Sequence, residues 1–370
     1  MQRTFAILAL LAAIATSAHA QRSWQTEFGV QGGWTRLVFA GSRGDPTDIL
    51  SLPGFNLGTL IPGATGLYAI IPTSEKLAVE TDFAASQFSF GATISAVHLG
   101  LRGDYALTRH AYGAAGATLT YINGIANETQ LGLQAALGYR YSVSGRLNGR
   151  VEVRTTFTGK ADNASPMDLY SVLLGVSTPT GRSRTARNAS PAPSRRAWTA
   201  QLGIAGGYAN VHLIGTGSVT ALAFPGYGGA FANTLGGIVP GFGAVTLPPT
   251  VFAIIPVTEK VAIEPGLDIH RVQGSGQTNF SGNLSARLDY AVHGGWYGGV
   301  GGNLQYFKST GVNAATRTGL NVGWGYRLSL PGAVGGRVEL NYTMFGRNTD
   351  LLLDPTNVLG LMVGVTMPLK

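Results

Sequence analysis

The chain of 370 residues contains no cysteine. A disulfide scaffold and metal sites built on thiolate ligands are therefore excluded. Charged residues are scarce as well, at 12% of the chain, whereas ordinary soluble domains have roughly 25%. Apolar residues nevertheless make up 45%. A soluble protein with this composition would have a poorly solvated surface, whereas a protein whose outside faces lipid has no such problem.

The sequence also lacks a long hydrophobic run that could cross a membrane as a helix, which would need about 18 or more apolar residues. One shorter apolar run, from Phe5 to Ala15, follows the basic Arg3 and precedes the small–x–small pattern Ala18-His19-Ala20. This arrangement is typical of an export signal. We therefore predict that residues 1–20 are a signal peptide and that the mature chain begins near Gln21.

Acidic residues are missing from the segment that accounts for most of the net positive charge. The net charge is +8, a value that is often associated with nucleic-acid binding. Five arginines, however, lie in the segment 180–196: Arg182, Arg184, Arg187, Arg195 and Arg196. Without these and Arg3, the net charge is only about +2. The charge belongs to a linker and not to a binding face, so we predict no nucleic-acid partner.

What the chain does contain is a long internal repeat. Residues 68–80 are YAIIPTSEKLAVE, and residues 252–264 are FAIIPVTEKVAIE. Further matches continue along both halves, and the offset between partners drifts only from 184 to 187. A repeat of this length is large enough to be a domain. We predict a tandem duplication with a first module at 21–179, a basic linker containing Pro and Ser at 180–196, and a second module at 197–370.

Both modules alternate apolar and polar residues with period two, which indicates β-strands. The first module has eight predicted strands, near 24–39, 65–72, 76–87, 93–107, 111–122, 130–143, 147–158 and 168–178. The second has eight matching strands, near 197–214, 249–256, 260–273, 281–292, 295–308, 316–329, 334–345 and 357–368. Their connections alternate between tight turns and long loops. The fold class predicted is all-β.

Short turns at one end and long loops at the other are typical of a transmembrane antiparallel up-and-down β-barrel. The lengths of the predicted strands fit the about 9–11 residues with which a tilted strand crosses a bilayer. Closure leaves no backbone group unpaired against lipid. The short turns would face the periplasm. Aromatic residues at that end predict an interfacial girdle: Trp24, Tyr105, Tyr141, Trp198, Tyr290 and Trp296.

Each half resembles the small eight-stranded outer-membrane barrels of the OmpA/OmpX type. The alternation, the short turns with sequences such as PTSEK, and the final strands 170–178 and 358–367 carry this resemblance. It implies a place in the cell outer membrane of a diderm (Gram-negative-type) bacterium, with outer-membrane lipid as a partner. Strands of this family usually close with a terminal aromatic residue, whereas this chain ends Met367-Pro368-Leu369-Lys370.

Charged residues of both signs fall on the predicted inward faces. They form a predicted lumen charge network: Glu80, Asp82, Arg102, Asp104, Arg140, Arg150, Glu152, Glu264, Arg287, Asp289, Arg327, Arg337 and Glu339, with Arg154 beside them. If each module closes alone, its interior is only wide enough for side chains, and the charges would pair to fill it. In one large barrel they would instead line a polar channel.

The sequence leaves open whether the chain forms two eight-stranded barrels or one sixteen-stranded barrel. The linker 180–196 favours two, because one barrel would ordinarily join its eighth and ninth strands by a short turn. Duplication into one sixteen-stranded pore is equally simple in physical terms, since the eighth strand need only pair with the ninth.

Three functions follow from these alternatives. The preferred one is a non-enzymatic structural, adhesion or binding role through surface loops, with a ligand or protein partner at the loops 40–64 and 215–248. A merged sixteen-stranded barrel would be a passive diffusion porin. An outer-membrane hydrolase is the third, but no catalytic constellation, metal-binding spacing or cofactor motif is found in the sequence. His98 shares a strand face with Arg102 and is predicted to be a hydrogen-bonding group in the lumen.

Overall fold

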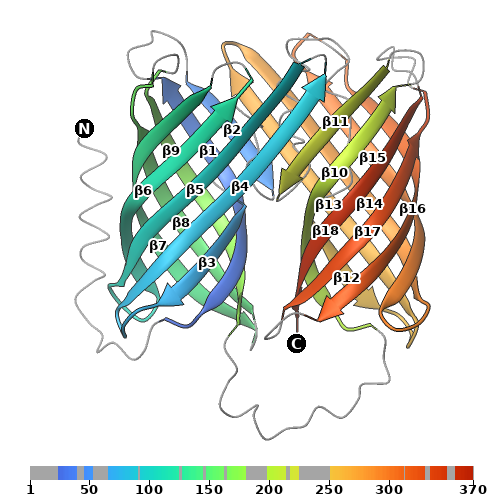
Figure 1. The fold of residues 1–370 in the computed structure, drawn as a ribbon, viewed down its shortest axis with the longest axis horizontal. Coiled ribbons are helices and arrows are strands. Elements are labelled where there is room, and N and C mark those ends of the chain that lie inside the picture. The colour runs from blue at the N-terminus through green and yellow to red at the C-terminus, as the bar shows by residue number, and fades with distance from the viewer. Residues whose placement is uncertain are drawn as a thin grey trace, which may run out of the picture.

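The computed structural model describes residues 24–39, 46–52, 66–90, 92–124, 127–144, 147–161, 165–180, 198–213, 217–224, 251–311, 313–329, 334–347 and 355–369. These residues form eighteen strands that are closed into barrels by antiparallel pairing (Figure 1). No helix in these ranges is both long and apolar enough to cross a membrane. The predicted signal peptide and residues 181–196 of the predicted linker lie outside the described residues.

Each half of the chain contributes nine strands to the described part of the structure. The first half has β1 (Glu27–Phe39), β2 (Thr47–Leu52), β3 (Leu67–Pro72), β4 (Leu77–Phe90), β5 (Ala92–Ala106), β6 (Ala111–Asn123), β7 (Glu128–Ser144), β8 (Leu147–Thr158) and β9 (Met167–Pro179). The second half has β10 (Gln201–Leu213), β11 (Gly217–Phe224), β12 (Val251–Pro256), β13 (Val261–Gly274), β14 (Gln277–Ala291), β15 (Trp296–Ser309), β16 (Ala315–Ser329), β17 (Gly335–Phe345) and β18 (Thr356–Pro368).

The end of the molecule with the tight turns at 73–76, 107–110, 257–260 and 292–295 is called the base, and the opposite end is called the rim. At the base each half closes on itself. β1 pairs with β9 along its whole length and with β3 over Glu27–Val30, which completes an eight-stranded ring of β1 and β3 to β9. β10 pairs in the same way with β18 and β12 and closes a second eight-stranded ring.

At the rim the two halves merge. β2 pairs with the upper part of β1 on one edge and with β13 of the other half on the other edge. β11 likewise joins β10 to β4 of the first half (Figure 1). Following these pairings around the rim gives one ring of sixteen strands, since β3 and β12 do not reach it. The molecule is therefore two barrels at the base and one barrel at the rim, so both alternatives left open by the sequence occur in the same structure.

Glycine marks the point at which the shared strands change partner. Gly33 and Gly207 are the first residues of β1 and β10 to pair with β2 and β11. A Cβ atom at either position would lie 2.1 Å from a carbonyl oxygen of the neighbouring strand. Gly207 also has a φ of 147°, which residues with a side chain rarely adopt. The change of partner thus requires glycine at this level of the barrel.

The predicted strands are present, but the description of two connections as loops was wrong. Residues 47–52 and 217–224, within the predicted loops 40–64 and 215–248, form β2 and β11. Each is a short strand that pairs with two neighbours, so its backbone groups are satisfied by the sheet. The remaining parts of those loops, 53–65 and 225–248, lie outside the described residues.

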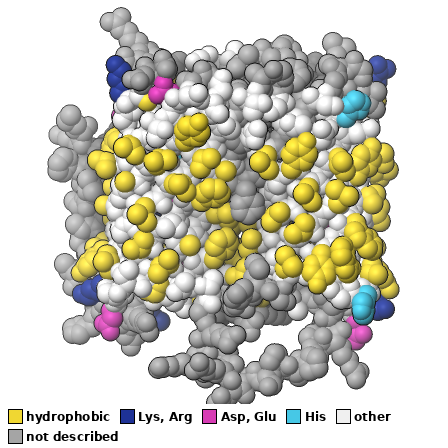
Figure 2. All heavy atoms as spheres, in the orientation of Figure 1, with side chains coloured by type: hydrophobic (Ala, Val, Ile, Leu, Met, Phe, Trp, Pro, Cys, Tyr) yellow, Lys and Arg dark blue, Asp and Glu magenta, His cyan; other side chains and the backbone are white. Residues whose placement is uncertain are grey.

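The outer surface carries a broad apolar band, and charged side chains gather above and below it (Figure 2). Leu133 and Leu320, on equivalent strands, are 69% and 61% exposed. Four of the predicted girdle residues are exposed at the base: Tyr105, Tyr141, Tyr290 and Trp296. The other two, Trp24 and Trp198, were wrongly assigned to the girdle. They precede β1 and β10, outside the regular alternation, and their buried indoles donate hydrogen bonds to the carbonyls of Lys76 and Lys260.

The two halves also contact each other below the rim. Val30 of β1, Ile204 of β10 and Met367 of β18 belong to one apolar cluster that draws on both halves. Val30 and Ile204 alternate with inward-facing neighbours and so lie on the outer faces of their strands, yet both are buried. The base rings are therefore packed side by side through apolar side chains.

Candidate functional site

The interior of the first base ring is filled by ion pairs around Arg102, which lies on β5. Its guanidinium contacts Glu152 of β8 at 2.5 Å, Glu80 of β4 at 2.9 Å and Asp104 at 2.9 Å. Because alternate residues of each strand point inward, side chains from three strands converge at one level. All four residues are at most 2% exposed. Charges buried in this way require partners, and here each has one.

A second arginine, Arg150 of β8, completes this level of the lumen. It donates hydrogen bonds to Glu80 and to Gln31 of β1. Its guanidinium also lies 3.5 Å from the centre of the Tyr68 ring, a cation–π contact. The Tyr112 hydroxyl donates to Glu152 at 2.6 Å. Side chains from opposite walls of the ring thus meet in the middle of the barrel.

A further layer lies closer to the rim. Arg154 contacts Glu152 at 2.7 Å and Asp82 at 3.3 Å. His98 connects Asp82, at 3.3 Å, with the hydroxyl of Thr120, at 2.9 Å. A carboxylate, an imidazole and a hydroxyl in this order occur in hydrolases, but here all three side chains are buried and Asp82 also binds Arg154. The arrangement is that of a packed lumen, in which His98 bridges two polar side chains.

The base of the first barrel is closed by a cluster of polar side chains beside Trp24. Arg140 contacts Glu27 and stacks on Trp24, with 4.8 Å between the guanidinium carbon and the ring centre. Glu27 also accepts hydrogen bonds from Asn148 at 3.0 Å and Ser177 at 2.6 Å. Trp24 packs edge-on against Tyr112, which links this cluster to the ion pairs above it.

The second lumen repeats the central layer of the first. Arg287 contacts Glu339 at 2.5 Å, Asp289 at 2.6 Å and Glu264 at 3.2 Å. Arg337 binds Glu264 and lies 3.6 Å from the centre of the Phe252 ring. The Tyr297 hydroxyl donates to Glu339 at 2.6 Å, just as Tyr112 does to Glu152. The two halves therefore use equivalent residues to seal equivalent rings.

The base of the second lumen differs in its charge. Arg327 stacks on Trp198, with its guanidinium carbon 4.0 Å from the ring centre, and Trp198 packs edge-on against Tyr297. The position that corresponds to Glu27 is Gln201. The stacked arginine and indole are thus retained, while the carboxylate that binds the arginine in the first half is replaced by an amide.

The layer nearer the rim also differs between the halves. Asn341 occupies the position of Arg154, and Gly266 that of Asp82. Asn341 exchanges hydrogen bonds with Asn321 at 2.6 and 3.3 Å. Asn321 corresponds to Gln134 of the first half, so the second half has an amide pair at this level and no counterpart of the Arg154–Asp82 ion pair.

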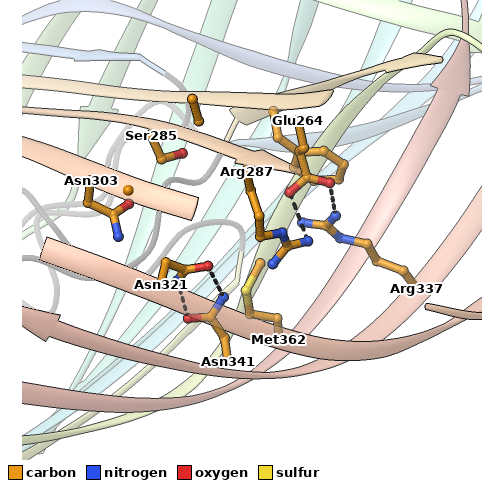
Figure 3. A pocket seen from close by; sticks show the side chains of 11 residues that line it. Glu264, Ser285, Arg287, Asn303, Asn321, Arg337, Asn341 and Met362 are labelled. Atoms are coloured by element: carbon orange, nitrogen blue, oxygen red, sulfur yellow. Dashed lines mark hydrogen bonds and ion pairs between the residues drawn. The ribbon is translucent and has the colours of Figure 1, made fainter. Parts of the chain in front are cut away.

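Asn321 and Asn341 line a small cavity in the second lumen, which has both polar and apolar walls (Figure 3). Its volume is about 20 Å³, which is room for roughly one water molecule. Ser285 and Asn303 line it on one side, and Glu264 lies at its edge between Arg287 and Arg337. The second lumen therefore contains a small cavity at this level, beside the ion pairs of Arg287.

Each residue of the predicted charge network lies on the inner side of a barrel. Arg140 and Arg327 are half-buried at the base, and the other eleven residues are buried. The predicted network did not include Glu27, Gln31 or the aromatic residues Tyr68, Tyr112 and Tyr297, although all five face the lumen. Alternation along β1 could have placed Glu27 and Gln31 inside. The repeated tyrosines at 112 and 297, each two residues after the end of a matching tight turn, were a second available signal.

Within the described ranges, no group of three or more histidine, aspartate or glutamate side chains is arranged to hold a metal ion. Acidic side chains in the lumen instead face arginines, as described above. The arrangement can exclude ions and fix the shape of the barrel. The ion pairs and the His98 group described above are buried, so none of them forms an acid–base pair open to a substrate.

Comparison with known proteins gives no family: no protein-family model and no curated protein matches the chain. Among solved structures, a Pseudomonas aeruginosa FadL homologue is 10% identical, over 97% of this chain and 94% of its own, with a TM-score of 0.28. The CymD monoaromatic hydrocarbon channel is 10% identical, over 95% and 90%, with a TM-score of 0.28. The KdgM porin is 10% identical, over 78% and 99%, with a TM-score of 0.23. Likenesses this weak carry no information about the function of this chain.

Proposed function

We propose that this chain is a non-conducting outer-membrane β-barrel protein with a structural, adhesion or binding role at its rim. In this proposal the chain arose by tandem duplication of an eight-stranded unit of the OmpA/OmpX type. The modules are residues 21–179 and 197–370, after a signal peptide at 1–20 and joined by the linker 180–196. The equivalent strand orders and equivalent ion pairs of the two halves support a duplication.

The observation that carries the proposal is the filled lumen of each base ring. Arg102 and Arg287 each bind three acidic side chains, and the residues of these layers are almost entirely buried. An ion that passed through would have to break several ion pairs in a water-poor interior. An eight-stranded ring has no room to widen around them.

The outer surface supports a place in the lipid bilayer. An apolar band of this extent would be costly to expose to water, while charged and aromatic residues border it as they do at a membrane interface. The partner proposed for the barrel wall is outer-membrane lipid, in a diderm bacterium. A surface ligand or protein partner would bind at the rim, at the segments 40–64 and 215–248.

A passive diffusion porin is the second candidate, because the rim does merge into a ring of sixteen strands. That ring, however, does not continue to the base. Solutes that entered the wide rim would meet two sealed eight-stranded rings instead of a channel. An outer-membrane hydrolase has less support, since the Asp82–His98–Thr120 group is buried and tied to Arg154.

The test is the single-channel conductance of the refolded mature chain in planar bilayers. We expect no steady steps from protein that is shown to be folded by its heat-modifiable mobility in gels. Steady steps of nanosiemens size would contradict a sealed lumen and favour the porin.

Two variants make this test sharper. Replacing Glu80, Arg102, Arg150 and Glu152 together by serine removes equal positive and negative charge from the first lumen, so small conductance steps are expected. The control replaces Arg36 and Asp48, an exposed ion pair outside the lumen, by serine. This second variant also removes one charge of each sign but should remain silent.

A further inference from the structure

The rim is closed by two short ladders that join the halves. The first, called the β2–β13 seam, pairs Asp48–Leu52 with Ile269–Gln273. The second, called the β4–β11 seam, pairs Ala85–Ser89 with Thr220–Phe224. Each seam contains five residue pairs. Every other ladder in the described structure lies within one half.

The registers of the two seams are equivalent. Leu52 pairs with Ile269, and Phe224 pairs with Ala85. Ile269 and Ala85 are separated by 184 positions, which is the offset between the repeated segments that begin at Tyr68 and Phe252. Leu52 and Phe224 also match each other, each standing before a Pro-Gly pair. β2 therefore pairs with β13 of the second half in the same register in which β11 pairs with β4 of the first half.

We propose that β2 and β11 can exchange partners, so that the rim alternates between one sixteen-stranded mouth and two eight-stranded mouths. In the exchanged closure β2 pairs with β4 of its own half and β11 pairs with β13 of its own half. β1 keeps β2 and β10 keeps β11, so these ladders act as hinges. Only the outer edges of β2 and β11 change partner.

The exchange conserves the backbone pairing of the barrel. Five pairs are lost at each seam, and the equivalent registers allow five to form again with the new partner. Leu50, for example, pairs with Arg271 in the structure and would pair with Gln87 after the exchange. Leu222 pairs with Gln87 in the structure and would pair with Arg271 after the exchange. Two packings of similar energy in one sequence are the requirement for a two-state element.

Side chains at the β2–β13 seam favour the merged mouth. The carboxylate of Asp48, which binds Arg36 at 2.8 Å, also feels the positive charge of Arg271. Thr47 lies against Gly274, where a Cβ atom would be 2.8 Å from the threonine hydroxyl oxygen. The position matching Gly274 on β4 is Phe90, which is not glycine. The exchanged closure would lose both of these local advantages.

The absence of cysteine from the chain makes a direct test possible. In the triple variant Leu50→Cys/Gln87→Cys/Leu222→Cys, the new thiol at position 87 can form a disulfide with either of two partners. A bond between positions 87 and 222 reports the merged mouth, and a bond between positions 87 and 50 reports the exchanged one. Paired residues of antiparallel strands have Cα atoms about 4.5–5.5 Å apart, which suits a disulfide.

The protein is folded under reducing conditions, purified as the folded form, and only then treated with a mild oxidant. We expect the 87–222 product to dominate and the 87–50 product to accumulate more slowly. Adding Arg271→Gln removes a positive charge that attracts Asp48. It should raise the proportion of the 87–50 product by about two- to fivefold, which is the upper part of the range for an attraction between exposed charges. Peptide mapping after digestion distinguishes the two products.

Two controls set the limits of the test. Leu133→Cys/Phe157→Cys joins β7 to β8, which stay paired in both closures, and should be oxidised completely. Gln87→Cys/Leu304→Cys places the thiols on strands that are adjacent in neither closure. The proposal is overturned if the 87–50 product does not exceed this background, with or without Arg271→Gln. It is overturned equally if that product forms only during refolding and never in the folded protein.

Discussion

Arg102 has three acidic neighbours and almost no contact with solvent, so its removal should be among the more damaging single changes in the barrel. Replacing it by methionine leaves Glu80, Asp104 and Glu152 buried with less positive charge around them. Breaking a buried pair from one side typically costs about 3–5 kcal/mol. We expect Arg102→Met to lower the free energy of unfolding by about this amount, as measured by urea titration of the protein in lipid vesicles.

The matched control is Arg36→Met, which removes an arginine that also binds an aspartate but is exposed at the rim. Water screens the charges of this exposed pair and can hydrate Asp48 once the arginine is removed. The urea concentration at the midpoint of unfolding should therefore be the same as in the unsubstituted protein. Equal destabilisation by both changes would mean that burial in the lumen is not what makes Arg102 important.

Single-residue predictions from the sequence were most reliable inside regular strands. Alternation placed Arg102, Glu152 and their counterparts on the inner face, because a strand turns every second residue to the same side. It misplaced Trp24, which lies just before β1, since no ladder fixes the direction of a side chain there. Contacts such as Tyr112 with Glu152 depend on the curvature of the closed ring, and no pattern within one strand contains that information.

The same limit appears for whole strands. Long strands were predicted because alternation continued for ten residues or more. β2 and β11 were described as loops because each is short and stands before proline and glycine. What makes them strands is pairing on both edges, including one edge from the other half of the chain. Such long-range pairing is a tertiary property that overrides local sequence preference.

Gly207 lies where β10 changes its pairing partner from β12 to β11, so a substitution there tests whether this change requires glycine. An alanine there would have to adopt a φ of 147° and would place its Cβ 2.1 Å from the Leu361 carbonyl oxygen. Strained backbone of this kind costs about 1–3 kcal/mol. We expect Gly207→Ala to lower the free energy of unfolding by about 1–3 kcal/mol or more, since the close Cβ contact adds to the backbone strain. We also expect it to weaken the pairing of β10 with β11. Hydrogen exchange of the backbone amides of 207–213 would measure the second effect.

Gly103→Ala is the control, because it also lies within a strand, yet a Cβ there would meet only a side-chain carbon of Leu77 at 3.9 Å. Its stability should be unchanged or slightly raised, since alanine restricts the unfolded chain. If the two alanine variants behaved alike, the change of partner would not depend on the glycine.

For the whole molecule, the sequence could establish a closed barrel but could not decide between one and two. β2 and β11 pair with the other half in equivalent registers, so either closure satisfies the same number of backbone pairs. A difference of a few side chains at the seam then selects the merged rim. The filled lumen is likewise a property of the whole ring, because Arg102, Glu80 and Glu152 come from three strands that meet only after closure.

The orientation of the molecule in a bilayer can be tested along a single strand, β7. Leu133 and Val143 lie on its outer face and are both exposed, but Leu133 is in the apolar band and Val143 is at the base. An arginine facing lipid costs about 2–4 kcal/mol at the midplane and about 0–1 kcal/mol near the interface. We therefore expect Leu133→Arg to lower the free energy of unfolding of the protein in vesicles far more than Val143→Arg does, as measured by urea titration. The reverse order would place the membrane elsewhere on the barrel. Equal and small effects would mean that this surface does not face lipid, and the apolar band would then need a protein partner to cover it.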